Sequence, residues 1–133
     1  VEEWLYWQVG GLGPMSGQAN HFRNYAPEKV EYGINRYTNE VNRLYGVMNR
    51  QLADHEYLAG DYSIADMASI GWMKSAERLG QNLNDFPHLK RWYDVVLARP
   101  AVERGLAVGA EVPRANLATD KDAQAVLFGQ KAR

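Results

Sequence analysis

Cysteine is absent from the 133 residues of this chain, and its absence excludes several kinds of chemistry at once. Without a thiol there is no disulfide framework, no thiolate nucleophile and no thiolate-ligated metal site. Long apolar runs are also missing: no stretch approaches the roughly 20 residues that a membrane-spanning helix needs, and no secretory signal peptide is visible. We therefore expect a cytoplasmic protein that makes no contact with a membrane.

An excess of charge of one sign is missing as well. Fifteen Lys and Arg residues stand against sixteen Asp and Glu residues, which gives a net charge of −1. Domains that bind nucleic acid usually carry a basic field, so we expect no nucleic-acid partner. The three histidines, His21, His55 and His88, do not pair at metal-ligand spacing, and we expect no metal. Nucleophile-elbow, phosphate-loop and dinucleotide-binding motifs do not occur either, so the residues alone show no catalytic apparatus.

Apolar and aromatic residues, by contrast, are plentiful. They make up 46% of a chain whose length favours one domain, and 4 Trp, 8 Tyr and 3 Phe provide material for a core. Their spacing is mostly three and four residues, which is typical of helices that bury one face. No stretch alternates well enough to predict a strand. The sequence therefore predicts an all-α bundle of about five helices, with a C-terminal tail.

The start of one helix is marked unusually clearly. Ser63 and Asp66 stand three residues apart, just before an apolar run, and so form a capping box in which each side chain bonds the other's backbone N–H. Tyr62 and Met67 occupy the positions of a hydrophobic staple. The cap accounts fully for Ser63 and Asp66, and we assign them a structural role rather than a catalytic one.

The other helices are marked by periodicity and by proline and glycine. A first helix over about 3–22 contains four glycines and Pro14, so we expect a kink near 10–14. Pro27 suits the first turn of a second, long helix, and its apolar stripe runs from Val30 to Leu52. The capped helix should run from Ser63 to about 78, nearly apolar all round and therefore in the middle of the bundle.

Two further helices and a tail complete the expected order. Helices should span about 87–98 and about 100–107, because each begins at a proline. We place a domain boundary near residue 110, with a C-terminal extension over 111–133. A weaker capping box at Thr119 and Asp122 could start one short helix in that extension.

Several residues allow both a structural and a functional interpretation. Arg36 lies at the flank of the second helix's apolar stripe, where it is either a solvated cation paired with Glu40 or a guanidinium that binds a ligand carboxylate. Gly10, Gly13 and Gly17 share one helical face, which permits either close helix packing or the approach of a ligand or a second subunit. Tryptophans in such helices are more often core residues than ligand-binding ones.

Two motifs resemble a known family. Residues 57–66 are similar to the buried-helix cap signature of the helical C-terminal half of glutathione transferases, and residues 86–92 with 99–102 are similar to its next helix pair. The opening at 4–15, together with His21-Phe22 and 34–37, resembles the bacterial Nu-class enzymes, which include glutathione-dependent disulfide-bond oxidoreductases. The resemblance covers about residues 2–110.

The resemblance implies a reaction of which this chain holds only part. A thioredoxin-like domain would precede Val1 and activate the sulfur of glutathione, so no catalytic residue is expected in this chain. Glutathione would be the substrate, an electrophile or a disulfide its co-substrate, and the protein a homodimer. The implied glutathione-binding residues are Arg36, Gln8 and His21. The implied pocket-lining residues are Trp4, Trp7, Met15 and Trp72.

One departure and one alternative remain. The subgroup usually has a proline before the tryptophan of its buried helix, whereas here Gly71 precedes Trp72, which leaves the shape of the pocket open. The alternative function is a non-catalytic helical interaction module of the kind fused to translation factors or aminoacyl-tRNA synthetases. The glycine-rich opening favours the enzyme, because such modules do not need it.

Overall fold

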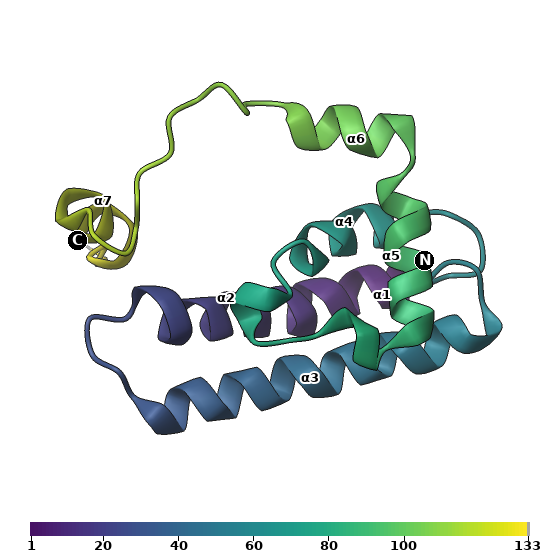
Figure 1. Cartoon of the computed structure of the whole chain (residues 1–133), viewed down its shortest axis with the longest axis horizontal. Coiled ribbons are helices and arrows are strands. Elements are labelled where there is room, and N and C mark those ends of the chain that lie inside the picture. The colour runs from purple at the N-terminus through teal and green to yellow at the C-terminus, as the bar shows by residue number, and fades with distance from the viewer. Residues whose placement is uncertain (133) are drawn as a thin grey trace.

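The computed structural model describes residues 1–132, which fold into helices joined by short turns (Figure 1). In that described part of the chain, extended backbone pairs only in two isolated β-bridges just before α4, so the all-α prediction is confirmed. In chain order, the elements are α1 (Glu2–Trp7), η1 (Gln8–Leu12), α2 (Gly13–Asn20), η2 (His21–Tyr25), α3 (Glu31–Asp54), α4 (Ile64–Met73), η3 (Glu77–Leu79), η4 (Leu83–Asp85), α5 (Pro87–Leu97), α6 (Pro100–Ala107) and α7 (Lys121–Phe128).

The first segment is one helical path from α1 to η2 that lies along the long helix α3 (Figure 1). Where a kink was expected, near 10–14, the structure has a π-helical stretch, η1. The N–H of Gly13 donates to the carbonyl of Gln8, five residues back. Pro14 has no N–H to donate, so the wider π spacing next to it keeps the path helical through a glycine-rich region.

Helix α3 confirms the predicted stripe from Val41 to Leu52, but the helix begins later than expected, and Val30 at its N-cap is 42% exposed. Val41, Leu44, Met48 and Leu52 are all buried. The helix starts at Glu31, so the placement of Pro27 in its first turn is wrong. Residue 26 already has extended backbone angles after η2, and the proline lies in the connecting loop that follows.

The capping box at α4 is confirmed, with both of its reciprocal hydrogen bonds. The carboxylate of Asp66 is fully buried, and its Oδ2 accepts from the N–H of Ser63 at 3.0 Å. Its Oδ1 accepts from the N–H of Leu58 at 3.0 Å and from the indole Nε1–H of Trp92 at 2.7 Å. One side chain thus joins α4, the turn before it and α5.

Helix α4 is shorter than predicted, because it ends at Met73 and not near residue 78. Beyond Met73, hydrogen bonds that span three residues appear: Ala76 donates to Met73, and Leu79 donates to Ala76 as well as to Ser75, four residues back. This tighter winding is the 3₁₀-type turn that often follows an α-helix. Gly80 ends η3 in the left-handed region, with φ of 74°, as the predicted stop.

The prediction that α4 is buried all round is wrong for one of its faces. Ala65, Ser69, Ile70 and Met73 are buried, but the side chain of Met67 is 52% exposed. The spacing of apolar residues shows that α4 has two apolar faces. It does not show whether the rest of residues 1–132 covers both of them or leaves one open.

Helix α5 is held by two side chains from outside it. The Oδ1 atom of Asn49, on α3, accepts from the N–H groups of His88 and Leu89 at 2.9 and 3.1 Å, and so caps the start of α5. Arg91, on α5, donates in return to the carbonyls of Leu52 and His55 at 2.9 Å each, at the end of α3. The predicted spans of α5 and α6 are both confirmed.

The C-terminal extension leaves α6 and crosses to the far end of the molecule, where α7 lies near the end of the first segment (Figure 1). The predicted short helix is present. The predicted capping box at Thr119 and Asp122 is wrong, because Asp120 and not Thr119 is the N-cap, and Ala123 at the third helical position has no side-chain acceptor to complete a box. The carboxylate of Asp120 accepts from the N–H of Ala123 at 2.9 Å.

Replacing Ser63 with alanine should destabilise the fold by about 1 kcal/mol, because one N-cap acceptor is lost while Asp66 keeps its other donors. Urea unfolding followed by tryptophan fluorescence would measure this change. Ser75→Ala is the matched control, since the Ser75 side chain makes no hydrogen bond within residues 1–132. Equal stability of the two variants would contradict the cap's contribution.

Candidate functional site

The structure brings two of the three predicted glutathione-binding residues to the same end of the bundle. Phe22 stacks on Tyr37 with ring centroids 5.4 Å apart, which joins η2 to the first turns of α3. Gly33 permits this contact, since a Cβ atom there would lie 2.8 Å from the Phe22 ring. His21 and Arg36 are the direct sequence neighbours of the two stacked rings, so their segments are held together.

Arg36 has a guanidinium that is largely available to a ligand. Its side chain is 55% exposed, and its Nη1 lies 3.9 Å from Oε2 of Glu40. Arg43 makes the shorter contacts to that carboxylate, at 2.7 and 2.9 Å. The hydrogen bond from Arg43 lowers the pKa of Glu40, partial burial opposes this, and the charges of Arg43 and Arg36 lower the pKa further. Glu40 is therefore committed mainly to Arg43.

His21 is half-buried in η2 and lies against aromatic rings. Its imidazole packs edge-on against Phe22, with centroids 5.6 Å apart, and against Phe128 of α7 at 4.9 Å. Together with Gly17 and Gln18, His21 and Phe128 line an open hollow of about 430 Å³. The contact with Phe128 places the tail directly over a predicted site residue.

Gln8 is placed differently from the other two predicted glutathione-binding residues. Its side chain is only 8% exposed, and its Nε2 donates to the carbonyl of Ala68 in α4 at 3.0 Å. It lies 13 residues before His21, which corresponds to roughly 20 Å along a helix. The structure thus shows a buried amide that joins η1 to α4, and the assignment of Gln8 to glutathione stays a prediction.

The four predicted pocket-lining residues are all half-buried against the edge of the core. Trp4 and Trp7 pack edge-on with centroids 5.2 Å apart. The indole of Trp72 lies against Gly13, where a Cβ atom would come within 3.3 Å of the ring. Gly13 is thus a packing glycine, whereas Gly10 and Gly17 have open space at the same position. Met15, the fourth predicted pocket-lining residue, also packs against the core.

The side chains at the η2 end can bind a ligand, but no catalytic group is visible among them. This end presents a largely exposed guanidinium, which suits a carboxylate, beside a half-buried imidazole and aromatic surface. Within residues 1–132, no three His, Asp or Glu side chains come together in a group that could hold a metal ion. No helix in the same range is long and apolar enough to cross a bilayer.

A second hollow was missed by the sequence reasoning. It lies between α4 and α6, has a volume of about 320 Å³, and is lined mainly by apolar side chains of these helices, with Tyr62 and Arg99 beside them. The guanidinium of Arg99 lies 3.6 Å from the centroid of the Tyr62 ring. The sequence did indicate it, because α4 has apolar residues on two faces. We had expected both faces to be enclosed in one core.

Comparison with known proteins adds what the isolated geometry lacks. The chain is 44% identical over 105 residues to the disulfide-bond oxidoreductase YfcG of Escherichia coli K12, with 78% of this chain and 49% of the relative covered. It is 43% identical over 115 residues to the disulfide-bond oxidoreductase YghU of the same organism, covering 79% and 39%. The chain therefore spans half or less of the length of these curated relatives.

The chain is also similar to solved structures of glutathione transferases. A glutathione transferase homologue from Lodderomyces elongisporus, with two glutathione molecules per subunit, superposes with a TM-score of 0.75 at 46% identity, over 84% of this chain and 52% of that one. Ure2p in complex with glutathione superposes with a TM-score of 0.74 at 35% identity, over 79% and 50%. Residues 18–100 match the family model described as glutathione S-transferase, C-terminal domain. The chain belongs to the family of glutathione S-transferase C-terminal domains.

Proposed function

We propose that this chain is the helical half of a protein that uses the thiol of glutathione, either to conjugate electrophiles or to reduce disulfides or peroxides. The observation that supports this most is the exposed guanidinium of Arg36, whose neighbouring carboxylate is already held by Arg43. Glutathione carries two carboxylates, and a planar guanidinium can bind one of them through two hydrogen bonds. Relatives of known name or structure favour this enzyme over a non-catalytic interaction module.

The reacting groups are proposed to lie outside this chain. The matched relatives are about twice as long as the portion that aligns here, and residues 1–132 show no activated nucleophile. In this proposal a thioredoxin-like domain before Val1 stabilises the glutathione thiolate, and the helical half supplies Arg36, His21 and the aromatic wall. Gln8 would act from its buried position beside α4. The cytoplasm is the proposed location.

We also propose a homodimer that forms through the outer side of the first segment. Tyr6 and Val9 are 73% and 60% exposed there. Gly10 and Gly17 present bare backbone with open space around them, so a second subunit could approach closely. Gly10 and Gly17 would then serve the contact between subunits, whereas Gly13 packs inside the subunit against Trp72.

The proposed division of labour is tested by comparing this 133-residue chain with the complete protein. We expect no glutathione conjugation and no glutathione-dependent disulfide reduction from the chain alone, because the group that activates the thiol is proposed to lie outside it. The complete protein should conjugate an electrophile or reduce a disulfide or a peroxide, measured with a chromogenic electrophile, a small disulfide and a hydroperoxide. Activity of the chain alone, or a complete protein that performs none of these reactions, would contradict the proposal.

Replacing Arg36 with alanine in the complete protein should weaken glutathione binding about tenfold or more, because hydrogen bonds to a charged group are worth about 1.5–3 kcal/mol each. Isothermal titration would measure the dissociation constant. Arg50→Ala is the matched control: it lies on the same helix, is exposed and forms no ion pair among the described residues. If both variants bind glutathione equally well, Arg36 does not have the proposed role.

Replacing Gly10 with glutamate should shift the complete protein from dimer towards monomer without unfolding it. A Cβ atom added at Gly10 meets no atom within 4 Å in the free subunit, but the glutamate would bury an unpaired charge against a second copy. Sedimentation velocity over a range of concentrations would measure the shift. Ala53→Glu, an exposed site near the end of α3, is the control that adds the same charge elsewhere. A dimer of unchanged affinity would place the interface on another surface.

A further inference from the structure

The C-terminal extension and the helical body enclose a third hollow between them. It has a volume of about 660 Å³ and is lined by residues 114–118 and Leu127 of the extension, by Asn24 and Tyr25 of η2, and by Arg78 of η3. In Figure 1 the extension passes from α6 to α7 at this end of the molecule. Small-molecule sites in proteins commonly measure about 300–1,000 Å³, so the hollow has the size of a site for a small ligand.

The charged side chains that line this hollow are both arginines. Arg78 comes from the body and Arg114 from the extension, and no Asp or Glu of residues 1–132 lines the same space. Glu77, the sequence neighbour of Arg78, lines a different hollow. Within residues 1–132 Arg114 forms no ion pair, and its guanidinium donates no hydrogen bond. Two like charges in one hollow repel each other, and an anion bound between them would remove this cost.

Arg78 is fixed through both its side chain and its backbone. Its Nη2 donates to the phenol oxygen of Tyr25 at 2.8 Å, and its guanidinium carbon lies 5.7 Å from the centroid of that ring. Its carbonyl accepts from Nε of Arg23 at 3.2 Å and from Nδ2 of Asn24 at 3.1 Å. A guanidinium has five N–H groups, and the others on Arg78 donate to no atom of residues 1–132. A ligand would therefore meet donors that are already in position, which lowers the entropy lost on binding.

The remaining lining suits the apolar part of a small organic molecule. It consists of the Tyr25 ring and of the aliphatic side chains of Ala115, Leu117, Ala118 and Leu127. One further donor is present at Asn116. The Oδ1 atom of its amide accepts from the N–H of Ala118 at 3.1 Å, which orients the group, and its Nδ2 has no acceptor among the described residues. The hollow thus combines two cations, one amide donor and an apolar surface.

We propose that the hollow lined by Arg78 and Arg114 binds a small organic acid, a molecule with a carboxylate or a phosphate on a short apolar body. The acidic group lies between the two guanidiniums, each of which can donate two hydrogen bonds to it. The apolar body lies against the leucines and the Tyr25 ring, and the bound acid joins the extension to the helical body.

This site is distinct from the proposed glutathione site. Arg36 and His21 do not line the hollow. The wall made by the extension lies beyond residues 18–100, which match the family model. The inference therefore does not rest on the proposed function, and it holds whichever reaction the complete protein performs.

The test is isothermal titration of the complete protein in excess glutathione, with phenyl phosphate and benzoate as the phosphate and carboxylate probes. We expect one site per chain, and the tighter probe shows which acidic group the site prefers. Arg114→Gln should weaken that probe about tenfold or more, because its charge-assisted hydrogen bonds are lost. The substitution breaks no bond of residues 1–132, so the fold is kept.

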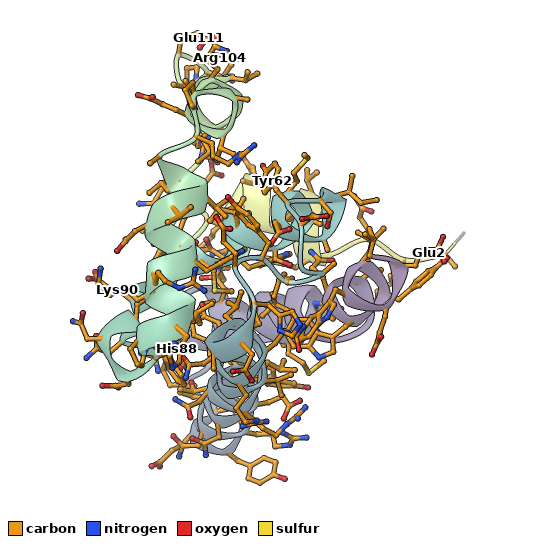
Figure 2. All side chains as sticks on the ribbon, turned by 90° about the vertical axis from the view of Figure 1, so that its right-hand side faces the viewer. Glu2, Tyr62, His88, Lys90, Arg104 and Glu111 are labelled. Atoms are coloured by element: carbon orange, nitrogen blue, oxygen red, sulfur yellow. The ribbon has the colours of Figure 1, made fainter. Side chains whose placement is uncertain are left out.

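Arg104→Gln is the matched control. Arg104 is exposed and forms no ion pair among the described residues, and Figure 2 shows it on α6 at the outer edge of the molecule. It does not line the hollow, so its replacement should change the affinity by about twofold or less.

A second measurement follows the extension itself. A saturating probe should slow trypsin cleavage after Arg114 about fivefold or more, because the bound acid holds this side chain and its segment. Benzyl alcohol, which has an apolar body without an acidic group, should leave the cleavage rate unchanged.

Three results would overturn the inference. The first is equal affinity of the Arg114 and Arg104 variants for the probe. The second is inorganic phosphate that binds as tightly as phenyl phosphate, which would mean that the apolar lining contributes nothing and that the arginines hold any anion. The third is a probe that binds only when glutathione is left out, because it would then occupy the glutathione site.

Discussion

The structure depends on one buried carboxylate. Asp66 has no exposure to solvent, and it accepts hydrogen bonds from the backbone of Leu58 and Ser63 and from the indole of Trp92. A charge buried without donors would be very costly, so the three donating segments must be in place together for the fold to be stable. Because Trp92 is on α5, the same contact sets where α5 crosses α4, and α6 continues from α5. The contact between Asp66 and Trp92 therefore also sets the distance between α4 and α6 across the hollow.

The sequence predicted those features of the fold that depend on near neighbours. Ser63 and Asp66 stand three residues apart, so the start of α4 was visible, as was the stripe of α3. It did not show that Asp66 also binds Trp92, 26 residues later, because such a pairing depends on how helices cross. The start of α3 was misplaced because Pro27 fits a first turn, whereas the helical path ends after η2 and Ala26 already has non-helical backbone angles.

The candidate site was predictable to the same extent. Helical geometry placed Arg36 at the flank of a buried stripe, and its weak contact with Glu40 was foreseen. The i,i+3 spacing of Arg43 and Glu40 was also visible in the sequence, but the sequence analysis did not consider it, whereas nothing local indicated that Phe128 of the tail would pack on His21. Gln8 shows the limit of transferring a role by resemblance alone, since its amide is engaged with Ala68 in the described chain. Contacts far apart in sequence decided the outcomes at Gln8 and His21.

Asn49 gives the bundle an order of assembly. The first N–H groups of α5 are capped by an amide oxygen on α3, 39 residues earlier, and not by a side chain next to them in sequence. The beginning of α5 therefore gains its cap only after α3 has formed and docked, and fraying of this part of α3 would release the amides of His88 and Leu89 to solvent exchange. Two helices distant in the chain would consequently open and close as one cooperative unit.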